Sequence, residues 1–470
     1  MIPISDSSHS CALPQQSLCL LRTQSSACPC YPARNLVEMS APELRTRIEV
    51  LASEIRFQKQ ALTKLEHEKS LLERQLNAIV DPVARLPFET SSDIFSYLSL
   101  PVREGGSGRR GPQLLLNICK SWTSIALSTP TLWSAIRIDF PCAKLVHILP
   151  VWFQRAGNRP VSIFIHGDFT CLTYKVFSIV WRHGRLLKHL EISDDQLGYG
   201  GEIHYPELDI LWDTIPEPLV CLETLNVHSS YGDRGFLSSQ ILQLLHLAPN
   251  IVECIFDMAR LCEDTSAPLV IPTLRRLLFG RCDDAAVIKF LTLPALETLS
   301  VPMRVVVSGD LLSFFKRSAP PLRELVFGAR YGSLGHRDIM DPGELRECLR
   351  LVPSLARFEI VRRADLHVIT DLFLALADSP SLLPNLLSLV VHLDEEAPIS
   401  DSFWTAVYHA LLARTTQFQV VQFDTYYSLP ASKMPAPDIM AAFRELGADG
   451  TQVCINSQTT DTRPSYSFSS

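Results

Sequence analysis

A short apolar phrase recurs along the second half of the chain and constrains its fold more than any other feature. The phrase reads Leu-x-x-Leu-x-aliphatic or aromatic, and its copies are spaced 22 to 35 residues apart. A strand followed by a helix, repeated, can bury its apolar faces only by stacking on its neighbours. The copies are Leu187/Leu190/Ile192, Leu222/Leu225/Val227, Ile251/Cys254/Phe256, Leu274/Leu277/Phe279, Leu296/Leu299/Val301, Leu322/Leu325/Phe327, Leu355/Phe358/Ile360, Leu386/Leu389/Val391 and Phe418/Val421/Phe423. The repeat therefore predicts an α/β fold, a solenoid with a parallel sheet over residues 138–450.

The spacing also predicts where the other elements of the solenoid lie. It brackets the period of leucine-rich repeats, although the copies lack the Asn or Cys that usually follows the strand. Val161, Ile163 and Ile165 are expected to open the series as an atypical first strand. Helices are expected at Ser238–Leu247, Asp310–Lys316, Gly343–Leu351, Val368–Ala377 and Ser402–Leu412. The inner face of the sheet is expected to present Glu191, Asn226, Ile255, Ser300, Val326, Glu359 and Val390.

A doubly wound enzyme domain is the competing interpretation of this alternation. Such a domain needs a glycine-rich phosphate turn between a strand and a helix, and none occurs here. No Ser lies in a nucleophile elbow, and the histidines share no metal-ligand spacing. Those histidines are His166, His183, His204, His228 and His392. The sequence therefore predicts no enzyme activity, no cofactor and no metal site.

A different pattern governs residues 40–80. Residues 1–39 are expected to be a disordered arm, after which Ser40 and Glu43 have the spacing of a capping box that begins a helix. Apolar residues then alternate in steps of four and three, which is the heptad pattern of a coiled coil. The seam consists of Leu44, Ile48, Leu51, Ile55, Leu62, Leu65, Leu72, Leu76 and Ile79, interrupted by Gln58 and Lys69. The seam predicts a parallel dimer or trimer, or pairing with another coil. The alternative is one amphipathic helix that folds back on the rest of the chain.

Residues 81–137 contain two apolar stretches separated by a turn-rich insertion from Pro101 to Pro112. Two or three short helices are expected here. Two such helices expose more apolar surface than they can cover between them, and a stripe of this size usually marks a partner site. Leu132 and Trp133 are expected either to join this stripe or to seal the segment onto the next domain.

The order of motifs in this segment is specific. Leu86-Pro87-Phe88-Glu89 comes first, Ile118-Cys119-Lys120-Ser121-Trp122 follows, and Ser128-Thr129-Pro130-Thr131-Leu132-Trp133 closes the segment. In this respect the chain resembles the F-box-like proteins that are abundant in fungi. The resemblance implies that the segment binds a Skp-family adaptor, and through it a cullin. The contact residues that it implies are Leu86, Pro87, Ile94, Phe95, Leu98, Leu115, Ile118, Cys119 and Trp122.

The resemblance thus implies a substrate-recognition adaptor of an SCF-type cullin–RING E3 ubiquitin ligase, with the solenoid holding a substrate protein. Two alternatives stay open: an unrelated helical hairpin packed on the core, and a coiled-coil and solenoid scaffold without a ligase.

Composition limits the remaining partners and the compartment. The net charge of −7 and the absence of clustered Lys and Arg argue against nucleic-acid binding. No apolar run is long enough for a membrane span. Thirteen cysteines lie mostly at apolar positions without paired spacing, which predicts reduced thiols in the cytoplasm or nucleus. Residues 451–470 are polar and are expected to form a disordered tail.

Overall fold

The computed structural model describes most of the chain and divides it into two compact units, Met1–Glu73 and Arg74–Ser470. The described residues are 40–97, 112, 114–139, 145–167, 169, 173–194, 210–211, 216–229, 236–257, 259–260, 267–280, 286–301, 309–328, 341–361, 366–393, 399–415, 417–425, 433–448 and 450–457. The expected arm at 1–39, the last residues of the expected tail and Leu98 lie outside them.

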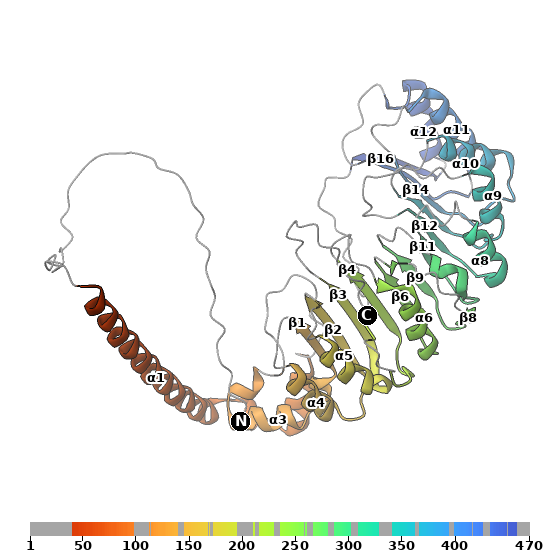
Figure 1. Ribbon diagram of the computed structural model, residues 1–470. Helices are drawn as coiled ribbons and strands as arrows, with labels where there is room; N and C mark the ends of the chain where they lie inside the picture. The colour runs from red at the N-terminus through yellow and green to blue at the C-terminus, as the bar shows by residue number, and fades with distance from the viewer. Residues whose placement is uncertain are drawn as a thin grey trace, which may run out of the picture. The chain divides into compact units, whose positions relative to one another are not determined.

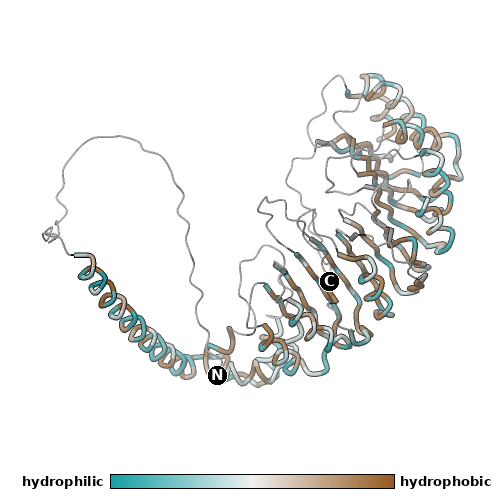
Figure 2. The backbone as a smooth tube through the Cα atoms, viewed as in Figure 1, coloured by the Kyte–Doolittle hydropathy of each residue, from teal (hydrophilic) through white to brown (hydrophobic). Residues whose placement is uncertain are grey.

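Helix α1, Ala41–Val80, confirms the predicted N-terminal helix, and the division between the two units falls inside it. Ser40 stands at its start, where the Glu43 carboxylate accepts hydrogen bonds from the Ser40 backbone N–H and hydroxyl, both at 2.8 Å. These bonds lower the pKa of Glu43. No residue of α1 is buried, and all nine aliphatic seam residues are exposed. Figure 2 shows apolar and polar residues alternating along it.

Residues 81–137, which we call the F-box-like segment after the sequence resemblance alone, form the short helices expected of them. Helix α2 (Phe88–Ser96) follows the Leu86-Pro87 turn, and helix α3 (Lys120–Leu127) ends just before Pro130. A proline is favoured at the beginning of a helix and disfavoured in its interior, so both prolines lie where a helix boundary needs them. Single 3₁₀ turns lie at Val83–Arg85, Leu115–Asn117 and Pro130–Trp133.

One large parallel sheet dominates the second unit (Figure 1). Its order is β1-β2-β3-β4-β6-β9-β11-β12-β13-β14-β15-β16, so the described strands follow one another in space as they do in the chain. The strands are β1 (Ala135–Asp139), β2 (Val161–Gly167), β3 (Leu187–Asp194), β4 (Thr224–Ser229), β6 (Glu253–Phe256), β9 (Arg276–Phe279), β11 (Thr298–Val301), β12 (Glu324–Phe327), β13 (Arg357–Ile360), β14 (Ser388–His392), β15 (Val420–Thr425) and β16 (Gln452–Ser457). Two short pairs stand apart: β5 (Phe236–Leu237) with β7 (Ala259–Arg260), and β8 (Leu269–Val270) with β10 (Leu291–Thr292).

Helices connect these strands and lie along one side of the sheet in Figure 1. They are α4 (Leu145–Ala156), α5 (Thr173–Arg182), α6 (Ser238–Leu247), α8 (Asp310–Ser318), α9 (Pro342–Arg350), α10 (Leu366–Asp378), α11 (Asp401–Ala413) and α12 (Pro437–Ala448), with 3₁₀ turns at Gly184–Leu186 and Ala286–Phe290. All five predicted helices are confirmed, with ends shifted by at most two residues. A doubly wound sheet reverses its strand order and carries helices on both faces, and the described strand order never reverses.

The register explains why the phrase repeats. In all nine copies the second and third apolar residues lie in a strand of this sheet and are buried, while the residue between them points to the other face. The residues expected on the inner face do form one register row across β3 to β14. The predicted period is therefore confirmed for the described strands, and these residues share one face of the sheet, which we call the inner face.

Side chains before the strands add a second ladder. Asn250 Nδ2 donates to Val220 O at 2.8 Å, and Asn385 Nδ2 donates to Pro353 O at 3.0 Å. Thr273 and Ser354 donate their hydroxyls to the preceding repeat in the same way, at 3.0 and 2.8 Å. Each of these residues sits between a proline and the first leucine or isoleucine of a phrase. A Pro-x-Leu/Ile step thus links successive repeats by side-chain hydrogen bonds.

The F-box-like segment and the sheet share one hydrophobic core. Trp133 is fully buried, and its ring meets Trp152 of α4 edge-on at 4.8 Å between centroids. The Arg155 guanidinium lies over the Trp133 ring at 4.4 Å, and the indole N–H donates to the Ala126 carbonyl at 2.9 Å. Trp133 therefore seals the segment onto the sheet.

The structure extends the sheet region at both ends beyond the expected bounds of 138–450. Residues 451–470 were expected to be disordered, but Gln452–Ser457 form β16, which pairs with β15 along its whole length. The polar composition of residues 451–470 conceals this short strand, in which Val453 and Ile455 are half-buried against the core. The expected boundary between residues 137 and 138 falls inside β1, which pairs with β2. Neither edge strand carries the phrase.

Candidate functional site

Trp122 and Asp81 hold the F-box-like segment together. The Trp122 indole N–H donates to one oxygen of the Asp81 carboxylate, and the other oxygen accepts from the Val83 backbone N–H at 2.9 Å. The Trp122 ring packs on Phe95 with 4.8 Å between centroids. Trp122 therefore couples α3 both to α2 and to the residue that follows α1.

Eight of the nine residues that the resemblance assigns to adaptor contact are described by the structure, all but Leu98, and they differ in burial. Phe95, Leu115 and Cys119 are buried, and Phe95 and Leu115 belong to the hydrophobic core that the segment shares with the sheet. Ile118 and Trp122 are half-buried. Leu86, Pro87 and Ile94 are exposed, with 41% of Leu86 and 44% of Ile94 accessible. In this conformation a partner can reach the last three directly, while the three buried residues support the surface from below.

Exposed apolar side chains are concentrated in this segment. Six large ones lie within residues 86–127: Leu86, Phe88, Ile94, Tyr97, Leu114 and Leu127. The described residues from 128 onward, a far longer stretch, contain seven: Tyr174, Val220, Val252, Val270, Leu374, Leu387 and Leu412. A concentration of exposed apolar side chains on a soluble domain usually marks an interaction surface. We refer to Leu86, Phe88 and Ile94 as the α2 stripe.

The seam of α1 is a second apolar surface. Leu44, Ile48, Leu51, Ile55, Leu62, Leu65, Leu72, Leu76 and Ile79 are all between 47% and 72% exposed. Most helical stability in proteins comes from packing of an apolar face, so a partner on the seam would stabilise this 40-residue helix.

The inner face of the sheet contains a polar cluster that was not predicted. His166 Nε2 lies 3.1 Å from Glu191 Oε1, and His228 Nε2 lies 4.0 Å from the same oxygen. The three residues come from β2, β3 and β4. The sequence does contain a signal for this cluster. His166, His228 and His392 each lie three residues after the middle apolar residue of their strand. That spacing can be recognised only after the strands have been aligned with one another.

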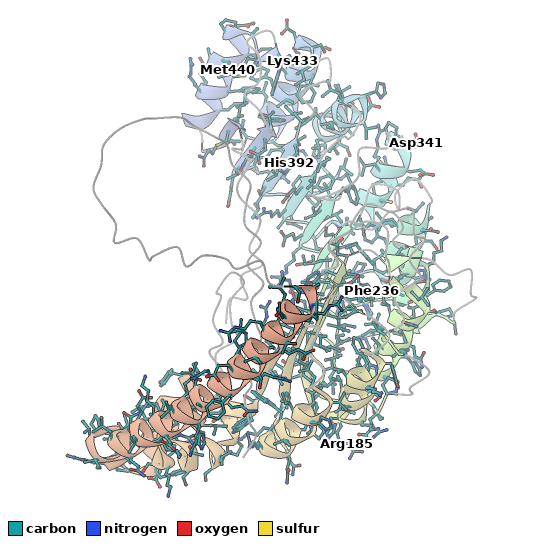
Figure 3. The ribbon with its side chains drawn as sticks, turned by 60° about the vertical axis from the view of Figure 1, so that its left-hand side comes forward. Arg185, Phe236, Asp341, His392, Lys433 and Met440 are labelled. Atoms are coloured by element: carbon teal, nitrogen blue, oxygen red, sulfur yellow. The ribbon has the colours of Figure 1, made fainter. Side chains whose placement is uncertain are left out.

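A second carboxylate lies further along the same face. Glu359 of β13 is 2% exposed, with Arg357 Nη2 at 3.3 Å from one oxygen and His392 Nε2 at 3.4 Å from the other. Figure 3 labels His392 among the strands and Asp341 at the start of the helix α9. Between the two carboxylates one register row contains Asn226 and Ser300 together with the buried Ile255, Leu278 and Val326. The neighbouring row on the same face carries the ion pairs Arg276–Glu253 and Arg357–Glu324.

Three titratable groups, Glu191, Cys254 and Cys348, have pKa values shifted away from their ordinary range. Burial raises the pKa of Glu191, but hydrogen bonds from His166 and His228 outweigh it and bring the pKa down to about 2. A carboxylate with so low a pKa is a poor proton acceptor at neutral pH. Burial also raises the pKa of Cys254 well above its usual value and that of Cys348 to about 12. Both thiols therefore stay protonated and unreactive.

Other site types find no support among the residues that the structure describes. They contain no cluster of three or more His, Cys, Asp or Glu side chains arranged to hold a metal ion. No described helix has the length and apolarity to cross a membrane. The crevice between α9 and α10, lined by Leu345, Val368 and Leu372, has room for about one water molecule.

Comparison with known proteins adds no family to these observations. No family model matches the chain, and no curated protein matches it. Its function is therefore inferred from its residues and their geometry.

Proposed function

We propose that the chain is a substrate-recognition adaptor of an SCF-type cullin–RING ubiquitin ligase, in which the F-box-like segment binds a Skp-family adaptor. The observation that carries the proposal is the concentration of exposed apolar side chains in residues 86–127, on a small helical segment with the F-box motif order. Leu86, Pro87 and Ile94 would make the direct contacts. The buried Phe95, Leu115 and Cys119 would act by fixing the shape of that surface.

The packing of the segment on the sheet supports this role. An adaptor contributes orientation and effective concentration, while a recruited conjugating enzyme performs the covalent step. A rigid connection between the docking segment and the substrate-holding region is useful for that task. Trp133, Trp152 and Arg155 provide such a connection through a shared core.

The sheet region fits a leucine-rich-repeat-like solenoid, and we propose its inner face as the substrate surface. The strand order follows the chain, and the Asn, Thr and Ser ladder links successive repeats. Each repeat in such an array contacts mainly its neighbours. A mixed apolar and polar face suits a protein surface, and its arginines Arg276 and Arg357 are already paired with carboxylates, which leaves few free cations for a phosphorylated partner.

A scaffold without a ligase is the second candidate, and the exposed seam of α1 favours it. In that case α1 would assemble the protein, and the α2 stripe would not bind a Skp-family protein. The two proposals share the substrate surface and differ only at the stripe.

The test is capture of the full-length chain by a purified Skp-family adaptor. Leu86→Glu/Ile94→Glu places two charges in the proposed contact, and we expect it to weaken binding by about a hundredfold or more. Leu412→Glu is the matched control, because Leu412 is 50% exposed on α11. We expect it to bind as the wild type does.

Equal capture of Leu86→Glu/Ile94→Glu and Leu412→Glu would show that the α2 stripe is not part of the interface. Absence of binding by the correctly folded wild-type chain would favour the scaffold.

A further inference from the structure

Helix α1 uses one face to attach to its own chain and leaves another face free. Within the second unit, Arg74 Nε donates to Asn117 O and Asn77 Nδ2 donates to Ile118 O, both at 3.2 Å. In the heptad these residues lie at positions f and b, opposite the seam. Leu76 and Ile79 in the seam stay 60% and 72% exposed. At this end, therefore, the seam is not the face that packs on the chain.

The two polar residues of the seam occupy related positions. With Ile48 at position a, Gln58 lies at position d and Lys69 at position a. In an antiparallel helix pair, a residues of one helix face d residues of the other. The register that sets Gln58 opposite Lys69 of a second copy also sets eight of the nine aliphatic seam residues opposite one another, and Leu44 falls beyond the paired stretch. These layers are Ile48 with Ile79, Leu51 with Leu76, Ile55 with Leu72, and Leu62 with Leu65.

The charges beside the seam agree with the same register. Lys59 and Glu66 both lie at position e, and in this register each comes beside the other in the second copy. Because the pair is two-fold symmetric, this contact between Lys59 and Glu66 occurs twice. Lys69 also remains 3.5 Å from Glu73 of its own helix, and Gln58 donates to Glu54 at 2.7 Å, so both polar seam residues have local partners as well.

A parallel pair in register is less favourable. It would place Lys69 against Lys69 of the second copy and Glu68 beside Glu73 of the second copy. Its single favourable charged contact is Glu54 with Lys59, made twice. Like charges at a helix interface destabilise it by amounts similar to those that opposite charges contribute. The charge pattern thus selects the antiparallel arrangement over the parallel one.

We propose that the α1 seam binds α1 of a second copy of this chain, antiparallel, with Gln58 facing Lys69 of the second copy. This arrangement differs from the parallel dimer or trimer that heptad spacing alone predicts, and the test below distinguishes the two. The paired stretch, Ile48–Ile79, is about 46 Å long at the rise of an α-helix. The proposal rests on α1 alone and is independent of any ligase function.

The test is charge reversal in the full-length protein, with the dissociation constant measured by sedimentation equilibrium. Lys59→Glu and Glu66→Lys each replace two attractive contacts with two repulsive ones. Each single reversal is expected to raise the dissociation constant roughly tenfold. The double reversal Lys59→Glu/Glu66→Lys restores opposite charges and is expected to return it to near the wild-type value. Lys64→Glu, at the solvent-facing position c, is the control and should change little.

Several results would overturn the proposal. In a parallel dimer Glu66 lies beside Ala61, so Glu66→Lys would have no effect and the double variant would not recover. A trimer, or a wild-type protein that stays monomeric at concentrations of tens of micromolar, would also contradict it.

Discussion

Trp133 is the residue at which the F-box-like segment and the sheet are expected to lose their connection. It is 1% exposed, meets Trp152 edge-on, lies under Arg155 and donates to the Ala126 carbonyl. Trp133→Ala removes all of these contacts at the boundary between the two regions. Trp133→Phe keeps a ring next to Trp152 but removes the N–H donor.

The magnitude follows from these contacts. Truncating a fully buried tryptophan to alanine costs about 3–5 kcal/mol through lost burial and the remaining cavity. The Ala126 carbonyl also loses its donor, which adds about 1 kcal/mol. We expect Trp133→Ala to lower the free energy of unfolding by about 4–6 kcal/mol, and Trp133→Phe by about 1–2 kcal/mol. Typical domains are stable by roughly 5–15 kcal/mol, so the first change removes a large share.

The assay is urea denaturation of the full-length chain followed by far-UV circular dichroism, with hydrogen exchange of the native protein alongside. If the core is shared, amides of α3 and of β1 should lose protection together in Trp133→Ala. A loss below about 2 kcal/mol would show that the Trp133 side chain does not hold a shared core, because truncation of a fully buried tryptophan costs more than that. Loss of protection in α3 with β1 unchanged would equally refute it.

Three further changes test other parts of the fold. Ionised Glu191 stabilises the fold above about pH 4.5, and this contribution is lost as the pH falls towards its folded pKa of about 2. Glu191→Gln should therefore cost on the order of 3 kcal/mol at pH 6 and little at pH 2.5 in urea denaturation, whereas a cost independent of pH would contradict the pairing with the histidines. Arg414 is buried and donates to the carbonyls of Leu376, Ser379 and Leu383, so Arg414→Met should lower the free energy of unfolding by about 2–4 kcal/mol in thermal denaturation, and an unchanged melting temperature would show that these bonds contribute nothing. Asp81→Ala should increase hydrogen exchange in α2 and α3, because Trp122 and Val83 lose their acceptor; exchange as slow as in the wild type would exclude Asp81 as the link.

The repeating strands were predictable because their signal is local and strong. The last two apolar residues of each phrase are two positions apart, which fixes the side of the strand that faces the core. Leu190, Leu225 and Cys254 are buried as predicted. The edge strands β1 and β16 were missed because they lack the phrase and are held by pairing with a neighbour. Tertiary pairing determines such segments more than their own composition does.

The candidate site was predictable only in part. The F-box motif order identifies a set of residues but cannot separate those that face a partner from those that face the core. Phe95 and Cys119 are apolar in both cases, and sequence spacing does not reveal that both are buried or that Phe95 packs on Trp122 of α3. The cluster of His166, Glu191 and His228 depends on strand register between β2, β3 and β4, which spans more than 60 residues of sequence.

Hydrogen–deuterium exchange of the full-length chain, with and without a purified Skp-family adaptor, measures whether residues 86–127 bind that adaptor. We expect new protection within residues 86–97 and 114–127, where the exposed apolar side chains lie, and none in β11 to β15. Protection on the sheet instead of these helices, or no protection at adaptor concentrations that saturate established F-box proteins, would show that these helices are not the adaptor-binding site.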